Sequence, residues 1–356
     1  MSDGLESVVA AETVLSHVDG AAGRLIYRGH MMEELAGIKS FEAVTQLFWD
    51  GFVPEAGDPE AFRAALGQAR CRAAEIMAPV LPFTDGLSPI EAQRMLLSAL
   101  PDTETTPHHL LVTAALPVFT AGIARRRAGL APMEPSAELG QAADFLRMLR
   151  GAPAPESHVH ALETYLVSVM DHGLNASTFT ARVVASTRAG IFSSVVAALC
   201  ALKGPLHGGA PGPVLDMLDA IGSEAEIVPW LESALDGGER LMGFGLRVYR
   251  VRDPRADVLK RVALTLRGQG NRILFAEAVE AKALEVLAKR KPDRRLDTNV
   301  EFYTALVLEA LELPRDFFTP VFGVGRVVGW VAHILEQQGS SRIIRPQSRY
   351  VGPAVG

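Results

Sequence analysis

The chain has 356 residues, of which 48% are hydrophobic and 6% aromatic, and its formal net charge at pH 7 is −6. This length suits one large domain or two joined ones, and the aliphatic, alanine-rich composition favours helices over strands. The mild negative charge gives no reason to expect binding to nucleic acid or to a membrane surface.

The two cysteines, Cys71 and Cys200, lie far apart and lack the spacing of metal ligands. Their number allows one disulfide, but reduced thiols are the simpler interpretation, and we expect no metal site. The acidic N-terminus has no apolar signal segment. The most apolar stretches, 110–124 and 191–202, are too short to span a bilayer. These features predict a cytoplasmic protein.

Residues 1–37 contain short polar turns and predict a small hairpin or an extended arm. Helices are then expected at residues 41–49 and 60–77. A third helix opens at Ser88-Pro89-Ile90-Glu91, because serine suits the N-cap, proline the first helical position and glutamate the third.

Further helices are expected at residues 107–127, 137–149, 158–170 and 177–202. Pro117 predicts a kink or break in the first of them. The last is long and apolar on most sides after Gly190, which indicates burial in a large core or at a subunit interface.

Between Gly208 and Leu313 the chain is more charged and its helices are shorter, which indicates a second, smaller domain. We place it at residues 212–312, with residues 1–211 and 313–356 forming the larger one. Apolar helices are expected at 301–311 and 321–338. No convincing run of alternating strands is present, so the predicted fold is all-α with two unequal domains.

Two histidines lie in short loops between expected helices. His207 follows Gly204-Pro205 and precedes Gly208-Gly209, a tight loop that can present an imidazole to a cleft. The loop alone favours a helix C-cap followed by a surface turn. His172 lies just before Asn175 and Ser177, either of which suits an N-cap. For His172 alone, capping is favoured over binding an anion.

Several arginines suit carboxylate or phosphate binding through paired hydrogen bonds. A solvated basic turn is the better interpretation for any single member of the cluster Arg247, Arg250, Arg252 and Arg255. Arg326 interrupts an apolar run and therefore needs a partner or an anionic ligand. Arg345 fits equally well as ordinary surface.

Glu301 follows Asn299, a suitable helix cap, so it falls in the first helical turn, where the helix dipole favours a carboxylate. That is a sufficient structural reason for Glu301. A role as catalytic base would need a raised pKa or a well-placed substrate proton.

In this order, the motifs together resemble the citrate synthase family over nearly the whole chain. The matching segments are Asp171-His172, Asn175-Ala176-Ser177, Gly204-Pro205-Leu206-His207-Gly208-Gly209, Gly243-Phe244-Gly245, Arg247-Val248-Tyr249, Asp253-Pro254-Arg255, Asn299-Val300, Arg326 and Arg345-Pro346. The resemblance implies an all-helical homodimer with a cleft between a large and a small domain. It also implies condensation of an acyl-CoA with a 2-oxo acid and release of CoA. The CoA thioester is then a co-substrate, and no cofactor is tightly bound.

The resemblance also implies roles for individual residues. His207 matches the histidine that hydrogen-bonds the thioester carbonyl, and Glu301 stands where an aspartate removes the methyl proton. The expected oxaloacetate ligands are His172, Asn175, Arg255, Arg326 and, from the other subunit, Arg345. The expected CoA contacts are Leu241, Gly243, Arg250 and Asn299.

Three positions depart from the family pattern. Leu246 replaces a histidine that polarises the acceptor ketone, and losing such a donor typically costs about 10²–10³ in rate. Glu301 replaces an aspartate, and its extra methylene moves the carboxylate by roughly 1 Å, which can cost about 10². Gly173 stands where the family usually has glutamate. An apolar Leu246 suits a less polar acceptor or a longer acyl chain, as in a 2-methylcitrate synthase-like role. The alternative is a non-catalytic subunit that binds CoA or carboxylates and regulates a partner.

Overall fold

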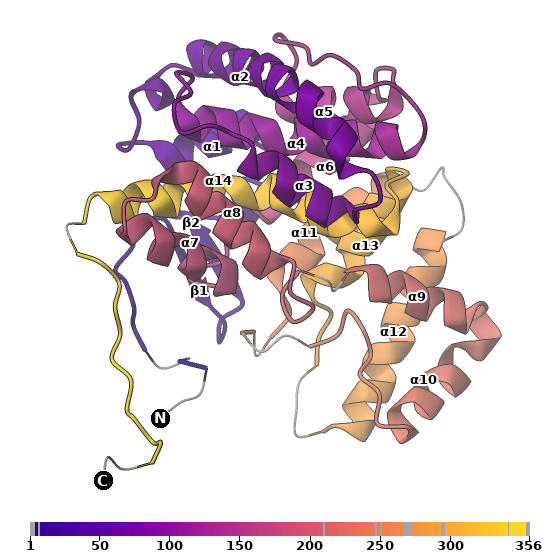
Figure 1. Ribbon diagram of the computed structural model, residues 1–356. Helices are drawn as coiled ribbons and strands as arrows, with labels where there is room; N and C mark the ends of the chain where they lie inside the picture. Colours follow the sequence, from indigo (N-terminus) through magenta and orange to yellow (C-terminus); the bar gives the residue numbers. More distant parts are fainter. Residues whose placement is uncertain are drawn as a thin grey trace.

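The computed structural model describes residues 4–5, 8–208, 211–245, 248–249, 251–266, 272–292, 296–340 and 342–353. Over these ranges the regular secondary structure is helical apart from one small sheet (Figure 1). The predicted all-α class is confirmed. Short 3-10 turns join several of the helices, at Met32–Glu34, Pro54–Gly57, Leu81–Thr84, Glu224–Glu226 and Arg315–Phe317.

The sheet is the predicted hairpin with a short third strand. Strands β1 (Ser16–Asp19), β2 (Arg24–Tyr27) and β3 (His30–Met31) pair antiparallel in that order. The buried Tyr27 hydroxyl donates to the backbone oxygens of Ser168, at 3.1 Å, and Asp171, at 2.9 Å. These bonds fasten the hairpin to the segment that carries His172.

Eight helices form the first part of the body. They are α1 (Phe41–Trp49), α2 (Pro59–Val80), α3 (Pro89–Ser98), α4 (His108–Arg127), α5 (Gln141–Arg150), α6 (Glu156–Ser168), α7 (Ala176–Ser186) and α8 (Gly190–Leu202). The predicted capping box of α3 is present, with reciprocal bonds between Ser88 and Glu91. Helix α4 continues through Pro117, so the alternative of a break there is wrong.

The prediction of one helix over residues 177–202 is also wrong. Helix α7 ends at Ser186, and α8 begins at Gly190. Between them Arg188 has φ of 62°, and Gly190 has φ of 89°. Left-handed backbone of this kind ends a helix, and glycine adopts it at no steric cost.

The remaining helices are α9 (Pro211–Ile221), α10 (Ile227–Asp236), α11 (Pro254–Thr265), α12 (Arg272–Arg290), α13 (Val300–Ala310) and α14 (Phe318–Gln338). Helices α9, α10 and α12 form a group to one side of the body, at the lower right of Figure 1, and α11 and α13 lie between that group and the body. Helix α11 packs on both α13 and α6, so it joins the two parts.

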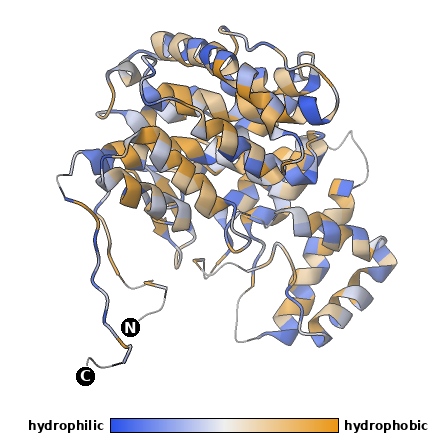
Figure 2. Ribbon diagram, viewed as in Figure 1, coloured by the Kyte–Doolittle hydropathy of each residue, from blue (hydrophilic) through white to orange (hydrophobic). Residues whose placement is uncertain are grey.

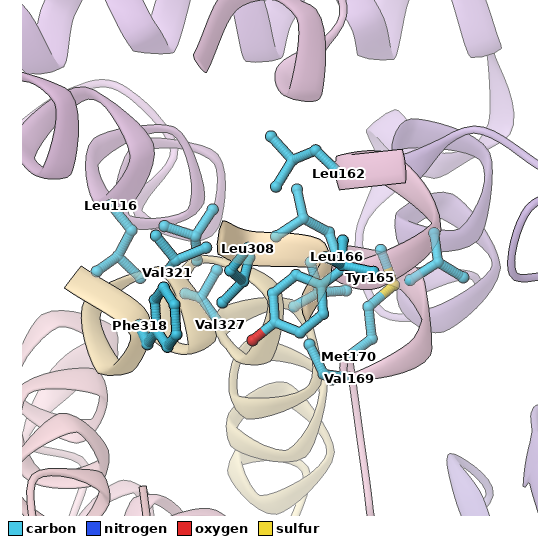
Figure 3. Packing of buried hydrophobic residues seen from close by; sticks show 14 of the residues in the cluster. Leu116, Leu162, Tyr165, Leu166, Val169, Met170, Leu308, Phe318, Val321 and Val327 are labelled. Atoms are coloured by element: carbon cyan, nitrogen blue, oxygen red, sulfur yellow. The ribbon is translucent and has the colours of Figure 1, made fainter. Parts of the chain in front are cut away.

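Helix α14 is the centre of the hydrophobic core. It packs against α4, α6, α7 and α8, and apolar side chains from α4, α6, α13 and α14 meet around it (Figure 3). Most residues of α14 are hydrophobic, whereas α2 and α12 mix hydrophilic and hydrophobic residues (Figure 2). Residues 315–338 are long and apolar enough to cross a membrane by length and composition alone, but 83% of the most apolar window is buried inside the fold.

Candidate active site

A pocket of about 150 Å³ lies where α6, α11, α13 and α14 meet the turn before α7 and the loop after α8. It collects six residues that the sequence singles out as candidates, from five separate segments of the chain. They are His172, Asn175, His207, Arg255, Glu301 and Arg326. Its remaining walls come from Tyr165, Val169, Gly208, Val248, Val300, Thr304 and Phe322.

The turn before α7 carries His172 and Asn175. The Asn175 side chain caps α7 by accepting the Thr178 N–H at 3.1 Å, as the sequence predicts for this position. His172 does not cap the helix, contrary to the interpretation favoured for it alone. Its Nε2 lies 3.1 Å from the Tyr249 hydroxyl, and the two rings meet edge to face. Burial, followed by the charges of Arg255 and Arg326, holds the pKa of His172 well below its ordinary value, so the imidazole is neutral.

Asp171 holds this turn through hydrogen bonds. Its buried carboxylate accepts the Gly173 N–H at 3.3 Å and also bonds the Ser16 hydroxyl. His333 Nε2 lies 3.3 Å from the same carboxylate, while His333 Nδ1 lies 3.0 Å from Arg182 Nη1. A guanidinium only donates, so Nδ1 accepts and Nε2 carries the proton toward Asp171. The hairpin, α7 and α14 together fix the backbone beside His172.

His207 is held through one ring nitrogen, which determines its tautomer. Its Nε2 accepts the Ser177 backbone N–H at 3.3 Å and lies 2.8 Å from the Ser177 hydroxyl. A backbone N–H can only donate, so Nε2 is unprotonated and the proton resides on Nδ1. Burial, with the charge of Arg326, lowers the pKa of His207 to about 4. At neutral pH, His207 is therefore an uncharged donor through Nδ1–H.

Arg255 is the second residue of α11 and is buried against Asp253, which caps that helix. Asp253 accepts the Arg255 backbone N–H at 3.0 Å and both its Nε, at 3.0 Å, and its Nη2, at 2.8 Å. The same carboxylate accepts the Val300 N–H at 3.2 Å. Burial lowers the pKa of Arg255, but the Asp253 charge and hydrogen bonds outweigh burial and raise it above its ordinary value. Arg255 thus stays charged and is tied to the start of α13.

Arg326 is 2% exposed on α14 and has no salt bridge to any described residue. Its Nε donates to the Val169 carbonyl at 2.7 Å, and its guanidinium lies 4.8 Å from the centre of the Phe322 ring. Burial lowers its pKa to about 10, so it is a cation at neutral pH. Its two terminal nitrogens bond no other described group. Burying such a charge is costly, and an anionic ligand bound in the pocket would stabilise it.

Glu301 lies in the first turn of α13, where the Asn299 side chain accepts its N–H at 2.9 Å. The predicted cap is confirmed. Burial raises the pKa of Glu301 above its ordinary value, partly offset by the charge of Arg255. A raised pKa makes the ionised carboxylate a stronger base.

Asn299 also joins α13 to the loop at residues 241–245. Its N–H donates to the Gly243 carbonyl at 2.9 Å, and its side-chain amide donates to the Gly245 carbonyl at 3.0 Å. Gly243 has φ of 84°, and an added Cβ would lie 2.8 Å from the Phe302 ring. Only glycine combines that backbone with so close an approach. The loop is therefore packed directly on the first turn of α13, beside Glu301.

None of the other six predicted site residues is among the described residues that line this pocket, and Gly243 and Asn299 lie in the contacts just described. Leu246 and Arg250 lie outside the described residues. Arg345 is exposed in the C-terminal tail, one residue after Ile344, whose N–H donates to the Ser186 hydroxyl at 3.0 Å. Leu241 is buried at the start of the loop described above.

The sequence did not indicate which side chains hold the two imidazoles in place. Tyr249 contacts His172, and Ser177 contacts His207, while the Trp330 indole N–H donates to the Ser177 hydroxyl at 3.1 Å. Tyr249 and Ser177 lie within the recognised motifs, but nothing in the local pattern indicates these partners. Over the described residues no cluster of three or more histidine, cysteine, aspartate or glutamate side chains could hold a metal ion.

The pocket brings together a neutral imidazole donor, a partly buried carboxyl of raised pKa and a buried guanidinium that has no ion-pair partner among the described residues. This combination suits an enzyme that performs acid–base chemistry on an anionic substrate. A family model described as citrate synthase, C-terminal domain, matches residues 4–347. The citrate synthase of Haloferax volcanii is 38% identical over 98% of this chain and 95% of its own length. Citrate synthase 2 of Bacillus subtilis is 36% identical over 98% and 95%.

Solved structures agree with these sequence relatives. The crystal structure of citrate synthase from Thermotoga maritima superposes with a TM-score of 0.88 at 34% identity, covering 100% of this chain and 97% of that one. The citrate synthase of Thermoplasma acidophilum, in a ternary complex with carboxymethyl coenzyme A and oxaloacetate, gives a TM-score of 0.89 at 28% identity, covering 100% and 97%. The chain belongs to the citrate synthase family.

Proposed function

We propose that this protein condenses an acyl-CoA with a 2-oxo acid and releases CoA, with acetyl-CoA and oxaloacetate as the first pair to test. The thioester is a co-substrate, and no tightly bound cofactor takes part. The relatives named citrate synthase support this reaction, as does the Thermoplasma acidophilum enzyme solved with a CoA analogue and oxaloacetate. These comparisons do not support the alternative of a non-catalytic regulatory subunit, and no contact in the pocket favours it.

The observation that carries the proposal is the buried, unpaired guanidinium of Arg326 in the same pocket as Arg255. Two fixed cations on different helices suit the two carboxylates of a 2-oxo dicarboxylate. His172 and Asn175 line the same wall and supply neutral polar groups. On this account, the acceptor binds between α7, α11 and α14 with its ketone toward Glu301.

The thioester side of the reaction follows from His207 and Glu301. Glu301 takes a proton from the carbon next to the thioester carbonyl, and the His207 Nδ1–H stabilises the oxygen that gains negative charge. The resulting enol carbon forms a bond to the ketone carbon of the acceptor, whose oxygen then takes a proton. Water cleaves the thioester, giving the tertiary hydroxy acid and free CoA.

CoA itself is assigned to the loop at residues 241–245 and to Asn299, with Arg250 as a phosphate contact. The packing of this loop on α13 would place its backbone next to the base. Leu246 follows the loop directly and offers no donor to the acceptor ketone. An alkyl group there suits a less polar 2-oxo acid or a longer acyl chain, which is the finer form of the proposal.

We also propose two domains, residues 1–211 with 313–356 and residues 212–312, and a homodimer in which Arg345 completes the partner's acceptor site. The exposed position of Arg345, away from the pocket of its own chain, is consistent with this role. The outward side of α8 carries small and apolar residues, including Val196, Ala197 and Cys200, which suits close packing against another helix.

Replacing Arg326 with methionine tests whether its buried guanidinium binds the acceptor. Oxaloacetate binding, measured by calorimetry, should weaken by roughly 10²-fold or more, about 3 kcal/mol, because one buried partner of the carboxylate is removed. The matched control is Arg126→Met, which removes a partly exposed arginine that is paired with Asp85 outside the pocket. Oxaloacetate binding of R326M that equals that of the control would contradict the assigned acceptor site.

A further inference from the structure

Glu280, on α12, is a buried carboxylate that the proposed reaction does not use. It is 4% exposed and accepts hydrogen bonds from four side chains. Its Oε1 receives Arg252 Nη1 at 3.1 Å and the Thr298 hydroxyl at 2.6 Å. Its Oε2 receives Lys260 Nζ at 2.8 Å and the Tyr303 hydroxyl at 2.6 Å. A carboxylate has about four acceptor positions, so its capacity is fully used.

Each of the four donors lies close in sequence to a residue of the proposed site. Arg252 directly precedes Asp253, which pairs with Arg255. Lys260 lies further along α11, the helix that carries Arg255 in its first turn. Thr298 directly precedes Asn299, and Tyr303 lies two residues after Glu301 on α13. One side chain thus joins the segments that carry the acceptor arginine, the cap and the base.

Thr298 extends this connection to the proposed CoA loop. It forms an isolated antiparallel bridge with Phe244. On either side of that bridge, the Gly245 N–H donates to the Asp297 carbonyl at 2.8 Å and the Asn299 N–H donates to the Gly243 carbonyl at 2.9 Å. The position of residues 243–245 therefore depends on a segment that is held by Glu280.

The charge state of Glu280 agrees with this arrangement. Burial raises its pKa, but the bonds from Lys260, Thr298 and Tyr303 outweigh burial and bring the pKa below its ordinary value. The carboxylate is ionised between two cations. A buried ionic cluster often adds little net stability compared with apolar residues of the same volume, and conformational specificity is one reason for such groups to be retained.

We propose that Glu280 is a positioning residue that fixes the loop at residues 241–245 and the first turn of α13 relative to α11. It thereby sets where the thioester lies with respect to Glu301 and Arg255. The inference rests on the proposed function for the roles of the loop and of Glu301. The positions of these segments can be measured without turnover.

The first test uses Glu280→Gln in the full-length protein. Glutamine keeps the shape but places an NH₂ group against one cation and one hydroxyl. The hydroxyl can turn to accept, but the bond from the cation is lost together with the ionic pairing, and the segments loosen. We expect kcat/KM for acetyl-CoA to fall by roughly 10–100-fold, as expected for a misplacement of about 1 Å. Glu285→Gln is the matched control, since Glu285 is exposed on the same helix and pairs with the exposed Lys282. It should stay within about twofold of the parent.

The second test uses Thr298→Val, which keeps the volume and breaks only the bond between Glu280 and the segment that holds the loop. The KM for acetyl-CoA should rise while the affinity for oxaloacetate, measured by calorimetry, is unchanged. E280Q should alter both, because either Arg252 or Lys260 also loses its acceptor, depending on which way the amide is turned. A role in stability alone would lower the melting temperature and leave both constants of the folded protein unchanged.

Hydrogen exchange separates this inference from the proposed function. Amides in residues 241–245 and 297–303 should exchange faster in E280Q and T298V than in E285Q. If the two variants exchange faster there but the parent protein turns over no thioester, the positioning role is supported and the proposed reaction is not. The inference would be overturned if folded T298V and E280Q matched E285Q both in amide exchange and in the kinetic constants for acetyl-CoA.

Discussion

Replacing Glu301 with glutamine is expected to lower kcat by about 10²–10⁴-fold, the usual contribution of a positioned general base. The amide cannot take the proton from the acyl carbon, but it retains the volume of the carboxyl group and its place after the Asn299 cap. Thiol release under saturating acetyl-CoA and acceptor measures kcat directly. Affinity for the acceptor should change little, because the acceptor carboxylates are assigned to Arg255 and Arg326.

The pH dependence of the parent enzyme follows from the direction of the Glu301 pKa shift. Burial raises this pKa, and the base must be ionised, so activity should fall as the pH decreases through the raised value. For stability the sign is the opposite: the native state binds the proton more tightly than the unfolded chain, so this group lowers stability as the pH rises. E301Q should therefore melt at the same temperature as the parent at neutral pH, or at a higher one.

The control for this variant is Glu285→Gln, which removes a carboxylate from an exposed position on α12. A folded E301Q with kcat within tenfold of the parent would assign the base to another group. Glu301→Asp shortens the side chain to the length usual in the family and tests how far placement matters, with a change of up to about 10² in either direction for a shift of about 1 Å.

Replacing Leu246 with histidine is expected to raise kcat/KM for oxaloacetate by about 10²–10³-fold. An imidazole there would supply the donor that polarises the acceptor ketone, and one such donor is typically worth that factor. The measurement compares steady-state thiol release with oxaloacetate and with less polar 2-oxo acids. The gain should be largest for oxaloacetate, because the parent's apolar residue suits the less polar acceptors.

Leu246→Met is the matched control, since methionine has similar volume and no donor. It should give no gain. The double variant Leu246→His, Glu301→Asp tests whether the two departures act independently, and neighbouring catalytic groups commonly do not. If the parent already processes oxaloacetate as fast as L246H, another group polarises the ketone and Leu246 is no deficit.

The helical fold was accessible from sequence because its signals are local. The first helix has the bounds predicted for it, 41–49, since a serine cap precedes it and glycine and proline follow it. The interruption between α7 and α8 was not recognised, because an apolar run continues on both sides of Arg188. Helix α4 continues through Pro117 for the opposite reason: nearly every residue around this proline is buried by neighbouring helices, and tertiary packing outweighs the local penalty.

The site was only partly predictable for a related reason. His172 and His207, taken alone, favoured capping and surface turns, and only the order of the motifs along the chain made them candidates. The contacts that define their chemistry are distant in sequence. Tyr249 contacts His172 from 77 residues away, and Trp330 acts on His207 through Ser177 from more than 100 residues away. No local pattern contains such pairs. Arg326 was recognisable because a charge in an apolar helix needs a ligand.

The most direct test of the proposed reaction is steady-state thiol release by the purified, folded protein with a panel of acyl-CoA thioesters and 2-oxo acids. We expect turnover with at least one pair, abolished in E301Q and retained in E285Q. Absence of turnover with every pair, in protein shown to be folded and dimeric, would contradict the proposed function.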